Sequence, residues 1–285
     1  MKVSIIGTPH CGRTVFLGLF YETLIRMNNA EGDDAQEVML STGPVEAKAF
    51  GDLRLELISG RWPNSENASK VSGRVVTLGF RKKRSIPFLR SRELTTVELE
   101  DVPLTEKDII VMRGTGQLRE VLMGSSGGSL DRYGMSERFR SALDSEALVL
   151  LVDLSKGRLE GAWPLPERDA FLATIVDNAS KTSLGRSRET TFIIVLTRAE
   201  RAEADDQKVF EEAYPRTAKA LQQAVASGAS SHIIVSWVGT EMDVRGSELP
   251  ATAMREGQVQ IDYSDKEYRR LVGIIGKIAR SRIRD

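Results

Sequence analysis

The chain has 285 residues, of which 41% are hydrophobic and 28% are charged, a balance typical of globular proteins. Lys and Arg together number 40, as do Asp and Glu, so the chain has no net charge that would favour nucleic acid or a membrane surface as a partner. Cys11 is the single cysteine, which excludes a disulfide within the chain, and no apolar run approaches the roughly 20 residues that span a bilayer. We therefore expect a soluble, cytoplasmic protein.

The N-terminal residues predict a strand, a tight loop and a buried helix. Residues 2–6 form a short β-rich run, and residues 14–27 are apolar on nearly every side, which is typical of a helix packed against a sheet. Between them, two glycines have the spacing of the phosphate-binding loop G-x-x-x-x-G-K-[ST], with arginine in place of the lysine. The loop residues are Gly7, Thr8, Pro9, His10, Cys11, Gly12, Arg13 and Thr14.

A loop of this kind binds phosphate because its backbone N–H groups point inward and the positive end of the next helix adds to their field. Its lysine reaches the β- and γ-phosphates, and its Ser or Thr binds Mg²⁺. The guanidinium of Arg13 can also neutralise phosphate charge, although it is planar, longer and prefers forked contacts with two oxygens. We predict that the eight loop residues bind a nucleotide and that Thr14 binds Mg²⁺. His10 and Cys11 fit better as walls of the loop than as metal ligands or a nucleophile.

The next segments predict an insertion and a hairpin. Residues 29–73 form a switch-like insertion, polar and acidic at first and then partly helical, with a loop signalled by Gly60 and Pro63. Residues 74–80 and 94–101 both alternate at period two, which predicts an antiparallel hairpin with a long connection.

A second insertion is predicted at residues 105–145. Within it, DIIVM at residues 108–112 indicates a strand, and the Gly/Ser-rich residues 124–129 predict a mobile loop. We expect this insertion to become ordered when a ligand binds.

Three continuous apolar runs predict buried parallel strands, at residues 147–153, 191–197 and 232–236. Helical segments are expected at residues 167–182 and 206–227, the second with a break near Pro215. Ser264 and Glu267 match the capping box of a C-terminal helix. Strands that alternate with helices imply an α/β fold, with a mostly parallel sheet, one antiparallel hairpin strand and helices on both faces. We expect a single domain.

The order of these features resembles that of the Ras-like P-loop GTPases, and it implies their three-layer P-loop NTPase fold. In that family, the second hairpin strand ends in D-x-x-G. The Asp holds Mg²⁺ through a water, and the Gly N–H touches the γ-phosphate. Residues 101–104 read DVPL here, so the resemblance assigns Asp101 to Mg²⁺ and places Leu104 where the glycine stands. A rival alignment uses RGTG at residues 113–116, which keeps the glycine, loses the acid and makes Gln117 a candidate for positioning water.

Two later strand ends resemble the guanine-binding motifs of the family. Residues 197–200 read TRAE where the family carries [NT]-K-x-D. The resemblance implies that Thr197, Arg198 and Glu200 bind the base, and that the carboxylate accepts hydrogen bonds from guanine N1 and N2. Ser236 begins SWVG where the family carries S-A-[KL], a place at which a backbone N–H reaches guanine O6. The alternative for the TRAE segment is an ordinary polar turn after a strand.

The loop before the hairpin carries a further resemblance. Residues 59–68 read SGRWPNSENA, and a G-x-W-P element at this place is similar to the large prokaryotic GTPases of the double-GTPase group. In them, a Mg²⁺-binding threonine follows W-P closely, and Ser65 is the nearest hydroxyl here. Trp62 fits equally well as a contact with a protein partner and as an anchor of the loop.

The resemblance implies a guanine-nucleotide-binding protein that uses GTP, GDP and Mg²⁺, with GTP hydrolysis that is slow or depends on a protein partner. The alternative is a pseudo-GTPase that serves as an interaction scaffold, because Arg13, Leu104, Arg198 and Glu200 all depart from the family pattern. A P-loop ATPase or kinase has less support. Such proteins usually carry an h-h-h-D-[DE] strand, and residues 147–153 supply only Asp153.

Overall fold

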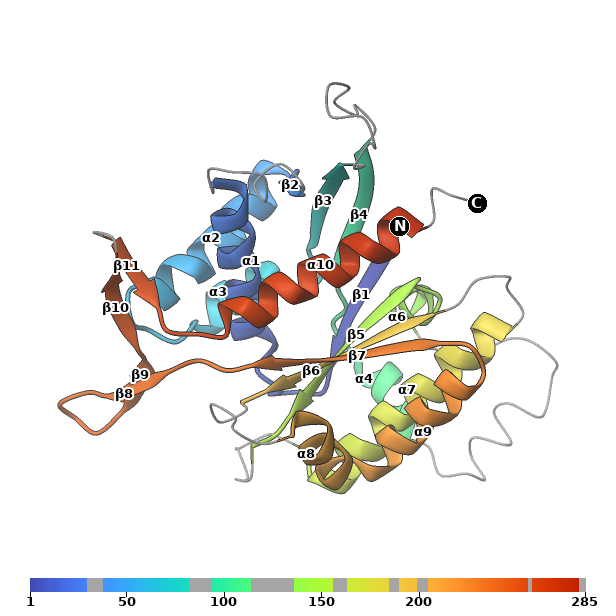
Figure 1. Ribbon diagram of the computed structural model, residues 1–285. Coiled ribbons are helices and arrows are strands. Elements are labelled where there is room, and N and C mark those ends of the chain that lie inside the picture. Colours follow the sequence, from blue (N-terminus) through green and yellow to red (C-terminus); the bar gives the residue numbers. More distant parts are fainter. Residues whose placement is uncertain are drawn as a thin grey trace.

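Figure 1 shows a computed structural model of the chain. The structure describes residues 1–29, 38–81, 94–113, 136–155, 163–184, 190–198, 205–255 and 258–281. In this part of the chain, no helix is both long and apolar enough to cross a membrane.

A seven-stranded sheet runs through the molecule in the order β2-β3-β4-β1-β5-β6-β7 (Figure 1). β1 (Lys2–Gly7) lies in the middle and is parallel to both of its neighbours, β4 and β5. β3 is antiparallel to its two neighbours, β2 and β4, and the remaining pairs are parallel. The predicted parallel sheet with one antiparallel hairpin strand is therefore confirmed. The other strands are β2 (Val38–Leu40), β3 (Val75–Arg81), β4 (Leu94–Asp101), β5 (Ala147–Asp153), β6 (Thr191–Thr197) and β7 (Ser230–Ser236).

Helices cover both faces of this sheet, because successive side chains of a strand point to opposite faces. Val3 and Ile5 of β1 belong to one apolar core, and Ile6 belongs to the other. The first core is closed by α1 (Arg13–Asn29), α2 (Pro44–Ile58) and α10 (Asp265–Ser281). The second is closed by α6 (Glu137–Leu143), α7 (Leu165–Leu184), α8 (Asp206–Ala213) and α9 (Pro215–Ala226). The expected α/β arrangement with helices on both faces is confirmed.

Residues 108–112 were expected to form a strand, and this prediction is wrong. They belong to α4 (Glu106–Arg113). The backbone N–H of Asp108 donates to Thr105 Oγ1 at 3.2 Å, and the backbone N–H of Thr105 donates back to Asp108 Oδ2 at 2.9 Å. This reciprocal pair is a capping box, which starts a helix. A short apolar run does not distinguish strand from helix by periodicity, so this start signal decides the outcome. The Gly/Ser-rich residues 124–129 lie outside the described residues.

Two of the predicted helix boundaries are confirmed, namely the break near Pro215 and the start after Ser264. α8 ends at Ala213 and α9 begins at Pro215, since proline cannot continue a helix but is tolerated at its first position. α10 begins at Asp265, directly after Ser264. The hydroxyl of Ser264, however, accepts a hydrogen bond from the backbone N–H of Trp237 at 3.1 Å. It thereby ties the start of α10 to the end of β7.

The switch-like insertion contains α2 and α3 (Ser65–Val71). The loop between these two helices contacts a region after β7 that was not predicted from the sequence. Two small ribbons follow β7. They consist of β8 (Thr240–Met242) with β9 (Glu248–Pro250), and β10 (Thr252–Arg255) with β11 (Gln258–Ile261). The indole N–H of Trp62 donates to the backbone oxygen of Glu248 at 2.8 Å. Trp62 therefore anchors its loop to β9.

Candidate functional site

The loop formed by residues 7–14 is called the phosphate loop below, because its sequence has the spacing of such a loop. It lies at the carboxyl end of the central strand. After β1, the chain forms β2, β3 and β4 on one side of that strand, and then β5, β6 and β7 on the other side. In open α/β sheets, ligands bind outside the carboxyl ends of the strands at such a reversal of strand order. The fold therefore places the phosphate loop where this class of sheet binds ligands.

The phosphate loop is tightly curled. His10 has φ 62° and Gly12 has φ 81°, both in the left-handed region that favours glycine. The backbone N–H of Cys11 donates to Thr8 O at 3.2 Å, which closes a turn. A side chain at Gly7 would collide with the buried sulfur of Cys11. The backbone conformation thus favours glycine at position 12, and the close approach of the Cys11 sulfur favours glycine at position 7.

Backbone donors converge on this loop at the start of α1. The N–H of Phe16 bonds to Gly12 O at 3.0 Å, so it is used inside the helix. The N–H groups that precede it belong to the first turn, which has no intrahelical acceptor for them. The N–H of Arg13 bonds to the buried thiol of Cys11, so those of Thr14 and Val15 are the ones that an anion could use. Together with the positive end of the helix dipole, they favour an anion. Pro9 contributes no N–H, so it removes one donor from the loop.

A hollow of about 440 Å³ lies over the phosphate loop. This volume is within the range of about 300–1,000 Å³ for small-molecule sites. Three elements join the loop in lining it, at Pro63, Leu104 and Arg198. The switch-like insertion, the end of β4 and the end of β6 therefore meet at one hollow. Leu104 and Arg198 were predicted to lie at this site, whereas Pro63 was predicted only as part of the loop before the hairpin.

Arg13 faces the end of β4. Its Nε lies 3.4 Å from Asp101 Oδ1, and its Nη1 donates to Val102 O at 3.3 Å. The other carboxylate oxygen of Asp101 accepts a hydrogen bond from the backbone N–H of Gly73 at 3.1 Å. Burial raises the pKa of Asp101, and the charge of Arg13 opposes that rise. The predicted phosphate ligand and the predicted Mg²⁺ ligand are therefore paired with each other.

The residues predicted at the end of β6 are attached to the phosphate loop and to β5. The hydroxyl of Thr197 donates to Cys11 O at 2.6 Å. Arg198, with φ 54°, places Nη1 3.4 Å from Asp153 Oδ2. Asp153 also pairs with the buried Arg168 at 2.6 Å. Thr197 thus holds the loop in place, and Arg198 reaches the hollow, whereas Glu200 lies outside the described residues, as does Gln117.

Ser236 ends β7, but its neighbourhood is bonded within the chain. Its hydroxyl shares a hydrogen bond of 2.6 Å with that of Tyr268. The next backbone N–H, of Trp237, donates to Ser264 Oγ, and that of Gly239 donates to Asp262 O at 2.7 Å. The N–H groups of Trp237 and Gly239 are therefore already in use. Ser236 itself is absent from the lining of the hollow.

A divalent cation would find few ligands supplied by the protein alone. No group of three His, Cys, Asp or Glu side chains suited to a metal occurs in the described ranges. Asp101 Oδ1 is buried and accepts no hydrogen bond from the described residues, although Arg13 Nε lies 3.4 Å from it. Thr14 lies in the first turn of α1. These two fit Mg²⁺ only together with phosphate oxygens and waters, which is how this ion is commonly bound. Ser65, the expected switch hydroxyl, begins α3 and does not line the hollow.

Among known proteins, no family model matches the chain, and no curated protein is significantly similar to it.

Proposed function

We propose that the chain binds a guanine nucleotide, with its phosphates in the phosphate loop, and that it hydrolyses GTP slowly or only with a protein partner. One observation carries the proposal. The loop between β1 and α1 is tightly curled at the start of a helix, with the cation Arg13 beside it, at the point where the strand order reverses. This combination suits a chain of phosphates better than an apolar ligand.

The choice of guanine follows from the residues after β6. Arg198 lines the hollow and presents a planar cation that can stack on a base. Glu200 carries the carboxylate that would accept two hydrogen bonds from the guanine edge. Because adenine offers no such pair of donors, the arrangement is proposed to be selective for guanine.

In this proposal, Thr14 and Asp101 would hold Mg²⁺, which would screen the charges of the β- and γ-phosphates. Arg13 would then turn from Asp101 toward the phosphate oxygens. The N–H groups at the start of α1 would bind and orient those oxygens. Hydrolysis by such a site depends on positioning and charge neutralisation, so it is slow without a partner.

A scaffold that binds no nucleotide is the second candidate, and one contact favours it. Arg13 already pairs with Asp101, and the carboxylate also accepts the Gly73 N–H. A phosphate would have to displace Arg13 from a buried counter-ion. If that exchange is unfavourable, the loop remains closed on itself.

A competition experiment with fluorescent nucleotides separates these candidates. We expect saturable binding of GDP and GTP analogues in Mg²⁺, weaker binding of ATP, and loss of guanine preference in Glu200→Ala. Glu212→Gln, an exposed change on α8, serves as the control. Absence of binding to every nucleotide at high micromolar concentration supports the scaffold. A preference for ATP contradicts the proposal.

A further inference from the structure

The end of β5 carries a buried carboxylate that two arginines share. Asp153 Oδ2 lies 2.6 Å from Nη1 of Arg168 and 3.4 Å from Nη1 of Arg198. The other oxygen, Oδ1, accepts a hydrogen bond from the backbone N–H of Ser155 at 2.9 Å. Asp153 is 1% exposed and does not line the hollow over the phosphate loop, whereas Arg198 does. Arg198 therefore connects a buried acid to the hollow.

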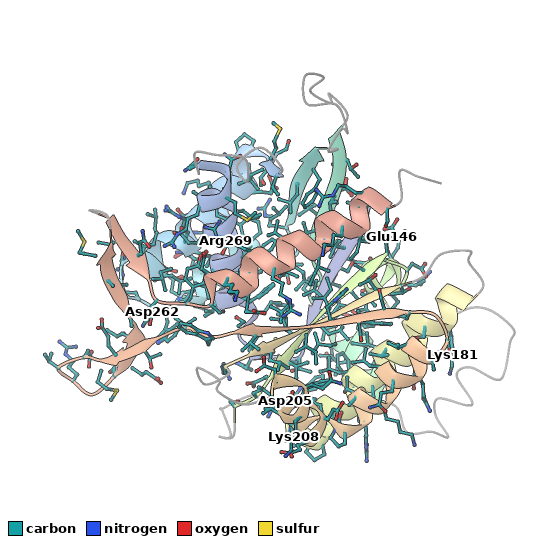
Figure 2. The ribbon with its side chains drawn as sticks, in the orientation of Figure 1. Glu146, Lys181, Asp205, Lys208, Asp262 and Arg269 are labelled. Carbon is teal, nitrogen blue, oxygen red and sulfur yellow. The ribbon has the colours of Figure 1, made fainter. Side chains whose placement is uncertain are left out.

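Asp153 and Arg168 form the fixed part of this arrangement. The side chain of Arg168, on α7, is 5% exposed, and its Nη1 also donates to the backbone oxygen of Asp153 at 3.3 Å. The same oxygen accepts a hydrogen bond from the hydroxyl of Tyr214 at 2.7 Å. Figure 2 shows α7, on which Lys181 is labelled, and α8, on which Lys208 is labelled, together on one face of the sheet. Packing in this layer holds the carboxylate in one place.

Arg198 is the exposed member of the group. Its side chain is 36% exposed, and its backbone has φ 54°, a left-handed conformation that is unfavourable for a residue other than glycine. The residue before it, Thr197, is bonded to the phosphate loop through Cys11 O. Within the described residues, Asp153 is the one carboxylate that Arg198 contacts. The backbone of Arg198 is therefore held near the loop, and Asp153 is the group that can orient its guanidinium.

The charge and the face of this guanidinium stay available to a ligand. Arg168 is the closer cation and already balances Asp153, so the three side chains together carry one net positive charge. The contact with Asp153 engages one Nη1 atom at the edge of Arg198, which leaves its face to stack on a planar group. A free arginine loses conformational freedom when it binds, and a contact that orients it beforehand lowers that cost.

We propose that Asp153 is a positioning residue, which holds the guanidinium of Arg198 in the orientation that stacks on the base of the bound nucleotide. This role rests on the proposed nucleotide site and adds to it a buried residue that does not touch the ligand. Arg168 keeps the carboxylate in place. Because the phosphates bind to the phosphate loop, the contribution of Asp153 is confined to the base.

Calorimetric titration with GDP and with pyrophosphate, both in Mg²⁺, separates the base from the phosphates. Asp153→Asn should weaken GDP binding by about three- to tenfold and leave pyrophosphate binding unchanged. In the Arg198→Ala background, Asp153→Asn should weaken GDP binding no further, because the side chain through which it acts is gone. Asp52→Asn, an equivalent change on α2 outside the hollow, should change neither affinity.

A second variant removes both buried charges. Asp153→Asn leaves Arg168 buried without its counter-ion, so the same titrations are made on Asp153→Asn combined with Arg168→Met. If GDP binds equally well to the native protein and to these variants, Asp153 does not position Arg198, while the nucleotide site stands. Equal weakening with and without Arg198→Ala, or equal weakening of GDP and pyrophosphate, would likewise overturn the positioning role. If the native protein binds neither GDP nor pyrophosphate, the proposed function fails, and this role fails with it.

Discussion

Arg13 and Asp101 join the phosphate loop to the end of β4, with 3.4 Å between Nε and Oδ1. Asp101 is 1% exposed, whereas the side chain of Arg13 is 28% exposed. The cation can therefore turn toward solvent or a ligand more easily than the carboxylate can. Since Asp101 also accepts the Gly73 N–H, the pair links the phosphate loop to the switch-like insertion.

Asp101→Asn should release Arg13 for phosphate. Without Mg²⁺, a nucleotide must take Arg13 from its carboxylate partner, and the variant removes this competition. We expect GDP to bind about three- to tenfold more tightly to the variant in the presence of a chelator. Binding of a fluorescent GDP analogue in EDTA provides the measurement. An unchanged affinity would show that the pair does not oppose binding.

Arg13→Ala should destabilise the protein in a pH-dependent way. Burial raises the pKa of Asp101 above its unfolded value, so the native carboxyl is neutral below that raised pKa and needs no cation. As the pH rises through the raised pKa, the buried charge forms without its counter-ion. We expect a loss of about 1–2 kcal/mol at pH 7.5, reduced by solvent at Arg13, and a loss that shrinks as the pH falls through the raised pKa. Urea unfolding over a series of pH values below 7.5 measures this, and a loss that does not change with pH would contradict it.

Gly12→Ala should destabilise the phosphate loop. A left-handed conformation costs a non-glycine residue about 1–2 kcal/mol, and Gly12 has φ 81°. Gly51→Ala is the matched control, because Gly51 lies within α2 and its new Cβ would meet nothing within 4 Å. That change should stabilise the protein by about 0.5–1 kcal/mol. Unfolding curves that give both variants the same sign would contradict the curled loop.

Thr197→Val should loosen the phosphate loop without changing side-chain shape. It removes the hydroxyl that donates to Cys11 O at 2.6 Å and leaves that carbonyl without this donor. We expect a loss of about 1 kcal/mol in unfolding free energy and weaker nucleotide binding. Thr197→Ser keeps the hydroxyl and should retain both. If valine and serine behave alike, the hydroxyl does not hold the loop.

The strands could be predicted from the sequence because continuous apolar runs such as residues 191–197 are buried along their whole length. The error at residues 108–112 has a local cause, since the Thr105–Asp108 capping box was not used as a helix start. The ribbons after β7 lack apolar periodicity, as the exposed strand β8 shows. They are held by contacts far away in the sequence, such as the bond from Trp62 to Glu248.

Within the candidate site, the curl of the loop was predictable from the glycines of the motif, as at Gly12. The site was not predictable where one side chain could bond to several alternative partners. Nothing in the sequence indicates that Arg13 pairs with Asp101. Nor does it indicate that the N–H groups after Ser236 bond to residues 262–264, because that choice depends on where α10 begins.

Calorimetric titration of the intact protein with GDP in Mg²⁺ tests the central claim most directly, with Gly12→Val as the paired variant. We predict one saturable site in the native chain and its loss in a variant that remains folded by circular dichroism. If GDP at millimolar concentration produces no saturable heat with the native protein, or if the variant binds equally well, the phosphate loop does not hold a nucleotide.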